Sequence, residues 1–348
     1  MRGDDTIREA VLWHPDDGRV RCAVCPHECR IAPGGRGICG VRENRDGVLV
    51  PLTYGLVSSV AADPIEKKPV FHYRPGAHVL SLGSVGCSMR CGHCQNWQIS
   101  RSGPDGNASL ERLDPARVPD LARDHRCAGV AFTYNEPVIW IEYVLDVARL
   151  CHAQGLFTVM VTNGYITPEA LDLLGEHIDV WRVDVKGFDD RVYREFCHAR
   201  SVGPVLAAAE RAKHRWGMHV EVVTNIVPTV NDDHETLSGI ASWIAEKLGP
   251  QTPWHLTRFF PAQEYAHLAP TPRETLLRAR ELGREAGLHF VFLGNIDEPG
   301  GEDTVCPQCG AVAVRRHGYS VEVQALVAGS CATCGQDLAI VEGASGHD

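Results

Sequence analysis

Between about residue 78 and residue 297, the chain alternates short, almost wholly apolar runs with longer amphipathic stretches. This pattern predicts parallel β-strands joined by crossover helices, because strands buried on both faces lose the usual polar positions of a two-residue period. Seven strands are expected, and they read VLSLGSV, GVAFTYN, LFTVMVTNG, DVWRVDVKG, HVEVVTNIVP, PWHLTRFF and LHFVFLGN.

Three of the intervening helices carry a recognisable start signal. Asp114, Thr167 and Thr271 each precede a proline, which predicts a capping side chain followed by the first helical position. Thr271 and Glu274 also have the spacing of a capping box, in which each side chain would bond a free backbone N–H of the other residue.

Strand–helix repeats of this kind form either a closed or partial barrel or a doubly wound open sheet. Polar residues follow nearly every predicted strand, and a barrel gathers all its strand ends at one mouth. We therefore expect a partial TIM-like (β/α) barrel that leaves one side open, although Asn and Asp also stand at strand ends for ordinary turn chemistry. The residues concerned are Asn135, Glu136, Thr162, Asn163, Asp184, Lys186, Thr224, Asn225, His255, Arg258 and Asn295.

Cys87, Cys91 and Cys94 form a Cys-x3-Cys-x2-Cys run directly after the first predicted strand. Four thiolates close an iron–sulfur cluster, whereas three thiolates on a [4Fe–4S] cluster leave one iron free to bind a small molecule. This spacing favours a catalytic cluster. The alternative is a zinc site with His93 as its fourth ligand, although zinc sites usually space their ligands as closer pairs.

Two further cysteine groups flank the predicted barrel. Cys22, Cys25, Cys29 and Cys39 can close a four-thiolate site, for which zinc is preferred and an auxiliary iron–sulfur cluster is the alternative. In the C-terminal segment two Cys-x2-Cys pairs, Cys306 with Cys309 and Cys331 with Cys334, have the spacing of a zinc ribbon. We expect three parts: an N-terminal metal knot with its linker at 1–77, the barrel at 78–299 and the ribbon at 300–348.

Composition narrows the function. The chain has 348 residues, 14 cysteines and a formal net charge of −10, which argues against broad binding to nucleic acid or to anionic membranes. No apolar run approaches the roughly 18 residues of a membrane span, and a cytoplasmic location is expected. Cys127, Cys151 and Cys197 stand alone and are expected to be buried.

One local basic segment departs from the acidic balance. DPIEKKPVFHYRPG brings together Lys67, Lys68, His72 and Arg74. Such a run is usually a solvated face, and the alternative is that it reaches the barrel mouth and binds an anionic group.

The motifs CPHECR, RGICGVR, DPIEKKPVFHYRPG, GCSMRCGHCQNWQIS, TYNEP, DVKGF, TNIVPTVND, CPQCG and CATCG together resemble the radical SAM enzyme of the AmmeMemoRadiSam grouping. The core is similar to the activating enzymes of glycyl-radical enzymes. This resemblance implies a [4Fe–4S] cluster, S-adenosylmethionine (SAM) as cofactor, an electron donor of the flavodoxin or ferredoxin type, and a Memo-type partner protein encoded separately.

The resemblance also implies roles for the strand-end residues. Glu136 and the carbonyls around Asn135 would receive the SAM ammonium, although the two glycines usual at this point are replaced. Asn163 would reach the ribose or the carboxylate, and Asp184 with Lys186 would lie near SAM and the substrate, unless these two form only a salt bridge. The remaining SAM contacts would be His93 near the adenine, with Asn225, Arg258 and Asn295 completing the cup.

Three functions are compatible with this sequence. The first is a radical SAM enzyme that cleaves SAM to a 5'-deoxyadenosyl radical and abstracts hydrogen from its substrate. The second is an activase that creates a glycyl radical on a partner protein. The third is a non-catalytic scaffold or binding module in which zinc fills all three cysteine groups.

Overall fold

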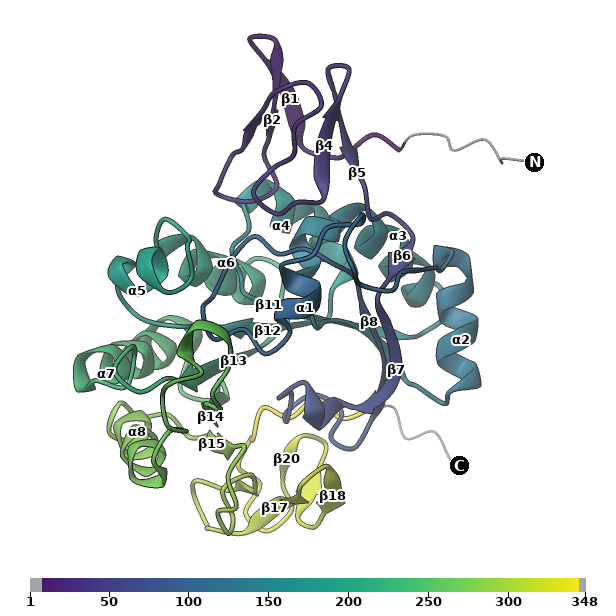
Figure 1. Ribbon diagram of the computed structural model, residues 1–348. Helices are drawn as coiled ribbons and strands as arrows, with labels where there is room; N and C mark the ends of the chain where they lie inside the picture. Colours follow the sequence, from purple (N-terminus) through teal and green to yellow (C-terminus); the bar gives the residue numbers. More distant parts are fainter. Residues whose placement is uncertain (1–7, 344–348) are drawn as a thin grey trace.

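A computed structural model describes residues 8–343. Its central sheet has eight strands, and all seven predicted strands are present in it (Figure 1). These seven are parallel, whereas the unpredicted eighth strand pairs antiparallel with its neighbour at one edge. From edge to edge the order is β15 (Val291–Gly294), β14 (Trp254–Arg258), β13 (His219–Ile226), β12 (Val180–Asp184), β11 (Phe157–Thr162), β10 (Gly129–Phe132), β8 (His78–Gly83) and β7 (Ser59–Pro64).

Helices surround the outer side of this sheet, so the expected partial barrel is confirmed (Figure 1). No helix within residues 8–343 has both the length and the apolarity needed to cross a bilayer. The α-helices are α1 (Trp97–Ser100), α2 (Val118–Asp124), α3 (Ile141–His152), α4 (Pro168–Leu174), α5 (Asp190–Glu195), α6 (Gly203–His214), α7 (His234–Trp243) and α8 (Arg273–Glu285). The shorter helical turns are η1 (Ile65–Lys67), η2 (Pro115–Arg117), η3 (Pro137–Trp140), η4 (Gly175–His177), η5 (Ile244–Leu248) and η6 (Gln263–Tyr265).

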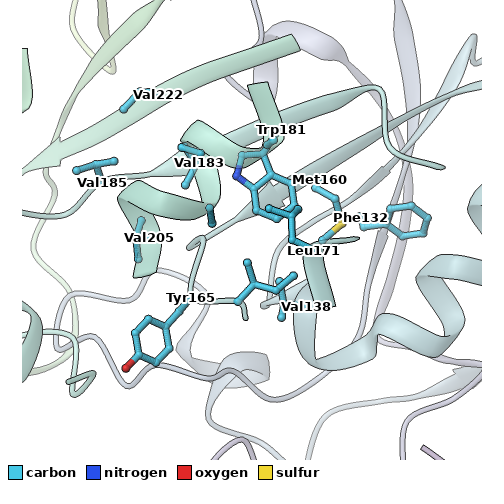
Figure 2. Close-up of a cluster of buried hydrophobic side chains, with 14 of the residues drawn as sticks. Phe132, Val138, Met160, Tyr165, Leu171, Trp181, Val183, Val185, Val205 and Val222 are labelled. Carbon is cyan, nitrogen blue, oxygen red and sulfur yellow. The ribbon is translucent and has the colours of Figure 1, made fainter. Parts of the chain in front are cut away.

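The two-residue period of β12 shows that one face of the sheet packs against the helices and the other faces the inside of the barrel. Trp181, Val183 and Val185 belong to the main hydrophobic core, as Figure 2 shows for the side chains packed around Leu171 of α4 and Val205 of α6. The residues between them, Arg182, Asp184 and Lys186, line a cleft on the other face. Successive side chains of a strand point to opposite faces, so one strand supplies both the core and the polar cleft.

The sheet interior also changes character along the strands. Apolar side chains near the strand starts form a separate buried cluster. Polar side chains occupy the same face towards the carboxyl ends. The interior is therefore filled at one end and open for a ligand at the other, as in other barrels. Members of the apolar cluster are Val79, Ala131, Phe157, Val159 and Val180.

The N-terminal region is a small β structure stacked beyond α3 and α4 (Figure 1). It contains a three-stranded antiparallel sheet and a hairpin, and a buried ion pair fastens it to α3. Arg42 donates to both carboxylate oxygens of Glu142, at 2.7 and 3.1 Å. The strands are β1 (Trp13–Asp16), β2 (Arg19–Cys22), β3 (Arg30–Ile31), β4 (Arg42–Arg45) and β5 (Val48–Pro51), followed by β6 (Leu56–Val57), which pairs with β9 (Glu111–Arg112).

The C-terminal region lies beside β15 at the opposite end of the view (Figure 1). Its core joins Phe71 of the segment after η1 to Phe290 and Phe292 at β15. Arg316 donates to the carbonyl of Phe71 at 2.7 Å, which ties the ribbon to that segment. The strands are β16 (Thr304–Val305), β17 (Val312–His317), β18 (Ser320–Val323), β19 (Leu326–Val327) and β20 (Ser330–Cys331).

Two of the three predicted helix caps are confirmed. Asp114 accepts from the Ala116 N–H at the start of η2, and Thr167 accepts from the Ala170 N–H of α4. The capping box at Thr271 is wrong, because Pro272 is the N-cap of α8 and its side chain has no group that can accept a hydrogen bond. The buried Thr271 hydroxyl instead accepts from Phe259 N–H and donates to the Ile226 carbonyl, at 2.8 and 2.6 Å, which ties the ends of β13 and β14 together.

Candidate active site

A cleft of about 380 Å³ opens at the carboxyl ends of the parallel strands. The cysteine run and all the side chains predicted to surround SAM line this one cleft, although the strands that carry them span more than 200 residues. These residues are Cys87, Cys91, His93, Cys94, Asn135, Glu136, Asn163, Asp184, Lys186, Asn225, Arg258 and Asn295.

Two strand-end residues that the barrel hypothesis included do not line the cleft. Thr224 alternates to the outer face, where it accepts from the Trp254 indole N–H at 3.0 Å. His255 lies deeper on the inner face and bonds Glu221 at 2.6 Å. Thr224 is excluded from the cleft by its position in the two-residue period, and His255 is excluded by its depth along the strand. A pattern of polar residues at strand ends contains neither kind of information.

The cysteine loop follows β8 and is shaped by tight packing. Gly86 has φ of +85°, and a Cβ there would lie 2.7 Å from the Cys39 carbonyl oxygen, so glycine is required. The Met89 N–H points at Cys87 Sγ at 3.4 Å, the Asn163 amide lies 3.6 Å from the same sulfur, and Cys94 Sγ lies 3.2 Å from the Ser100 hydroxyl. Donors directed at sulfur are suited to thiolates that hold a cluster.

The spacing of the sulfur atoms bears on the metal. Within residues 8–343, just one set of three or more Cys, His, Asp or Glu side chains brings all its ligand atoms within 4.8 Å of one another, and it lies in the C-terminal ribbon. The sulfurs of Cys87, Cys91 and Cys94 are therefore not gathered as closely as those of the ribbon. A four-iron cube spreads its ligands more widely, so this set of three thiols fits a cluster.

His93 does not act as a metal ligand in this arrangement. Its ring stacks on Phe196 with a centroid distance of 4.4 Å and an angle of 13° between the planes. Burial, assisted by the nearby Lys186 cation, lowers the pKa of His93 to about 3, so the ring is neutral. Phe196, which the sequence did not single out, is buried and packs against the His93 ring, while His93 itself lines the cleft.

Glu136 links the ends of β10 and β11. It accepts from the Thr162 hydroxyl at 2.6 Å, the Asn163 N–H at 2.8 Å and the Val138 N–H at 3.0 Å. Burial outweighs these bonds and raises the pKa of Glu136 to about 7. One side of the carboxylate remains towards the cleft, where a cation would restore its charge.

The side chain of Asn135 is engaged with the segment that leads into the cysteine loop. The side-chain oxygen Oδ1 accepts from the Ser84 N–H at 2.9 Å. The side-chain nitrogen Nδ2 donates to the backbone carbonyls of Val85 and Gly86 at 3.2 and 3.1 Å. The side chain is fully used in holding the segment that leads into Cys87. Asn135 therefore positions the cysteine loop.

Asp184 is held between two cations on the cleft wall. Lys186 Nζ lies 3.0 Å from one carboxylate oxygen and Arg182 contacts the other. Burial alone would raise the pKa of Asp184, but the two cations outweigh it and hold the pKa at about 2. Both readings of the Asp-x-Lys motif apply, because the salt bridge exists and also lines the cleft. Arg182 was missed, although its two-residue spacing from Asp184 places it on the same face.

The rim of the cleft carries further polar groups. Asn225 donates to Thr257, Arg258 donates to the Thr271 carbonyl, and Asn295 donates to the Arg258 carbonyl. These bonds fix the three side chains that the sequence placed around ribose and adenine. They connect the ends of β13, β14 and β15 across the cleft mouth.

The basic segment divides between two environments. Lys67 and Lys68 line the cleft and pair with Asp63 at 2.7 Å each, so this half reaches the barrel mouth. His72 is buried against Thr304 of the ribbon, and the Arg74 guanidinium lies over the Phe157 ring, so this half does not reach it. The sequence could not divide the run, because the division depends on contacts of each side chain with distant segments.

The lone cysteines are buried, as predicted. Cys197 nevertheless contacts Cys91 of the cysteine loop. A hydrogen bond from its thiol is the main cause that lowers the pKa of Cys91 below its usual value. No sequence signal marks this contact, since 106 positions of the chain separate the two residues.

In the C-terminal ribbon, Cys306 Sγ lies 3.6 Å from Cys334 Sγ, and Cys309 Sγ lies 3.6 Å from Cys331 Sγ. Four sulfurs placed tetrahedrally at 2.3 Å from one zinc would be about 3.8 Å apart. The group has the geometry of a site for a single metal ion.

Comparison with known proteins gives the same assignment. Residues 82–238 match the model of the Radical SAM superfamily. An uncharacterized protein of Methanocaldococcus jannaschii is 40% identical over 338 residues, covering 96% of this chain and 100% of that protein. The pyruvate formate-lyase-activating enzyme of Clostridium pasteurianum is 29% identical over 167 residues, covering 46% of this chain and 66% of the enzyme.

Among solved structures, a radical SAM methyltransferase from Sphaerobacter thermophilus superposes with a TM-score of 0.48 at 15% identity, covering 63% of this chain and 70% of that one. The three-cysteine loop, the partial parallel barrel and the superfamily match agree with one another. This chain belongs to the radical SAM superfamily and is related to the activating enzymes of glycyl-radical enzymes.

Proposed function

We propose that this protein is a radical SAM enzyme that abstracts hydrogen from a substrate held in the cleft at the carboxyl ends of its strands. Cys87, Cys91 and Cys94 would hold a [4Fe–4S] cluster that, when bound, supplies the electron for splitting the SAM sulfonium into methionine and a 5'-deoxyadenosyl radical. The observation that carries the proposal is the joint placement of three widely spaced thiols and the polar strand ends in one cleft.

The side chains of the cleft are suited to the two ends of SAM. The buried Glu136 carboxylate has no cation among its bonded partners and would accept the methionine ammonium, which would stabilise its charged form. Neutral His93, whose ring is held by stacking on Phe196, presents aromatic surface beside the cysteine loop, where an adenine can stack. Asn225, Arg258 and Asn295 are fixed at the rim to contact ribose and adenine.

Anaerobic reduction in the presence of SAM tests this proposal. We expect 5'-deoxyadenosine from the wild type and none from Cys87→Ala, Cys91→Ala or Cys94→Ala, because each variant lacks a cluster ligand. Cys127→Ala is the matched control, since Cys127 is a buried free cysteine outside the cleft. Continued cleavage of SAM by any of the three cleft variants would contradict the assignment.

A second candidate function is activation of a glycyl-radical enzyme. The similarity to the pyruvate formate-lyase-activating enzyme favours it. Incubation with SAM, reductant and candidate partner proteins would produce a protein-based radical in electron paramagnetic resonance (EPR) spectra. Formation of 5'-deoxyadenosine without such a radical would instead favour a small-molecule or modified-residue substrate.

The proposal also covers partners and metals. The electron would come from a flavodoxin- or ferredoxin-type donor, and membership of the AmmeMemoRadiSam grouping would imply a Memo-type partner. Zinc is proposed for Cys306, Cys309, Cys331 and Cys334, because the sulfur spacing matches one tetrahedral ion. Metal analysis of anaerobic protein that found zinc alone would leave only the non-catalytic scaffold.

A further inference from the structure

The four N-terminal cysteines surround a cavity that the proposed reaction does not use. Cys22 ends β2, Cys29 directly precedes β3, and Cys25 and Cys39 lie in the loops before and after that strand. All four line one enclosed cavity, whose remaining wall is mainly apolar. Four thiols from separate turns that converge on one cavity are a metal site by their chemistry.

The spacing of these sulfurs argues against a single zinc ion. The C-terminal ribbon shows what a mononuclear site looks like in this chain, with sulfur pairs at 3.6 Å. In the ribbon, all four sulfurs lie within 4.8 Å of one another. No three of the N-terminal sulfurs, all of which belong to described residues, lie that close together. They share this wider spacing with Cys87, Cys91 and Cys94, the ligands proposed for an iron–sulfur cluster.

The cavity itself points the same way. It measures about 10 Å³, which is roughly the space that one water molecule needs. Four sulfurs at 2.3 Å from a zinc ion would close around it and leave no such space between them. The four sulfurs are therefore not closed around a single point, which agrees with their wide spacing.

The N-terminal site lies directly against the cleft loop. Ser88, which follows Cys87, lines the same cavity as the four cysteines. His27, between Cys25 and Cys29, bonds the Ser88 carbonyl through its buried ring at 2.7 Å. On the other side, the Cys39 carbonyl packs against Gly86, one residue before Cys87. The two cysteine groups therefore share a wall that is a single loop thick.

We propose that Cys22, Cys25, Cys29 and Cys39 hold a second iron–sulfur cluster, closed by four thiolates, that passes electrons to the site of Cys87, Cys91 and Cys94. Four protein ligands leave no iron open for SAM, so this cluster can only exchange electrons. One electron from a flavodoxin- or ferredoxin-type donor reduces it, and the same electron then moves across the shared wall. No bond or proton changes in this step. The relay rests on the proposed function, whereas the identity of the metal does not.

The metal is tested in the triple variant Cys87→Ala/Cys91→Ala/Cys94→Ala, which leaves every N-terminal ligand in place. After anaerobic reconstitution with iron and sulfide, we expect about four iron atoms per chain. Reduction with dithionite should give an EPR signal that added SAM does not change. A variant without iron and with a second zinc would overturn the proposal.

If the triple variant does not fold, wild-type protein decides the question. About eight iron atoms per chain, four for each cluster, support the proposal, and about four with two zinc ions contradict it. Failure of the proposed function would look different, because the SAM-responsive signal would be missing while the iron of the N-terminal site remained.

The relay is tested by comparing reduction of the SAM-responsive cluster by reduced flavodoxin in the wild type and in Cys29→Ala. We expect the variant to lose about four iron atoms and to be reduced at least about tenfold more slowly. Cys151→Ala, which changes a free cysteine outside the three cysteine groups, is the control and should be reduced normally. An unchanged rate in Cys29→Ala would overturn the relay, and retention of all iron would overturn the ligand assignment.

Discussion

The N-terminal and C-terminal regions each carry four cysteines, but the protein attaches them in different ways. A buried ion pair, Arg42 with Glu142, fastens the N-terminal region to α3 beside the cysteine loop. Aromatic packing of Phe71 with Phe292 joins the C-terminal ribbon to β15, and Arg316 contributes hydrogen bonds to carbonyl and hydroxyl oxygens there. One region borders the candidate active site, and the other covers the edge of the sheet.

This comparison shows that a cysteine count indicates metal without indicating which metal or what it does. Sulfur spacing separates the ribbon, whose ligand atoms fit a single ion, from the N-terminal group, whose ligand atoms do not. Attachment separates their roles, because only the N-terminal group shares a wall with the cleft loop. Both properties are tertiary.

The largest difference in stability should come from breaking the N-terminal attachment. Arg42→Met leaves the Glu142 carboxylate buried without its cation, so we expect the free energy of unfolding to fall by about 3–5 kcal/mol. Urea denaturation measures this loss. Arg42→Met/Glu142→Gln should recover much of it, because the neutral amide still accepts from the Val11 N–H. A double variant no more stable than the single one would contradict the role given to the stranded charge.

A smaller loss is expected from the matching change at the ribbon. Arg316 donates to the carbonyls of Phe71 and Glu302 and to the Thr304 hydroxyl, but none of these acceptors is charged. Arg316→Met should lower the free energy of unfolding by about 1–3 kcal/mol, since unpaired acceptors cost less than an unpaired charge. The same denaturation series compares the two regions. A loss equal to or greater than that of Arg42→Met would show that the ribbon is attached as strongly.

The third effect is a pH dependence at the ribbon junction, and near neutral pH it is the smallest of the three. Burial lowers the pKa of His72 to about 3, whereas an unfolded histidine titrates near 6.5. Below pH 6.5 the unfolded chain therefore binds a proton that the folded chain does not, and stability falls by up to about 1.4 kcal/mol per pH unit for this group. In His72→Phe the new ring can pack against Phe290 as the imidazole does. Between pH 7 and pH 5 the free energy of unfolding of this variant should fall less than that of the wild type. Equal losses in the two proteins would exclude His72 as the cause.

Much of the fold followed from local patterns. The apolar runs predicted all seven parallel strands, because strands buried on both faces leave a strong and local signal. The antiparallel strand β7 was not predicted, because an edge strand with mixed burial does not form a continuous apolar run. The caps at Asp114 and Thr167 were predictable from adjacent residues, whereas Thr271 is engaged by β13 and β14, which lie far from it in the sequence.

The candidate site shows the same division. Strand ends of a parallel sheet meet at one edge, so the sequence alone could bring Cys87, Glu136 and Asp184 to one place. It could not show that the Asn135 side chain bonds the segment before the cysteine loop, or that Arg182 and Lys186 both pair with Asp184. Those facts depend on which neighbour each side chain meets.

The sequence by itself determined the repeating strand–helix order and the three cysteine groups, because apolar periodicity and ligand spacing are properties of neighbouring residues. Only the tertiary structure decided that His27 and Ser88 join the N-terminal cysteines to the cleft loop, and that Phe71 joins the ribbon to β15. Contacts between distant segments arise from packing and from the pairing of buried polar groups, for which no local pattern exists.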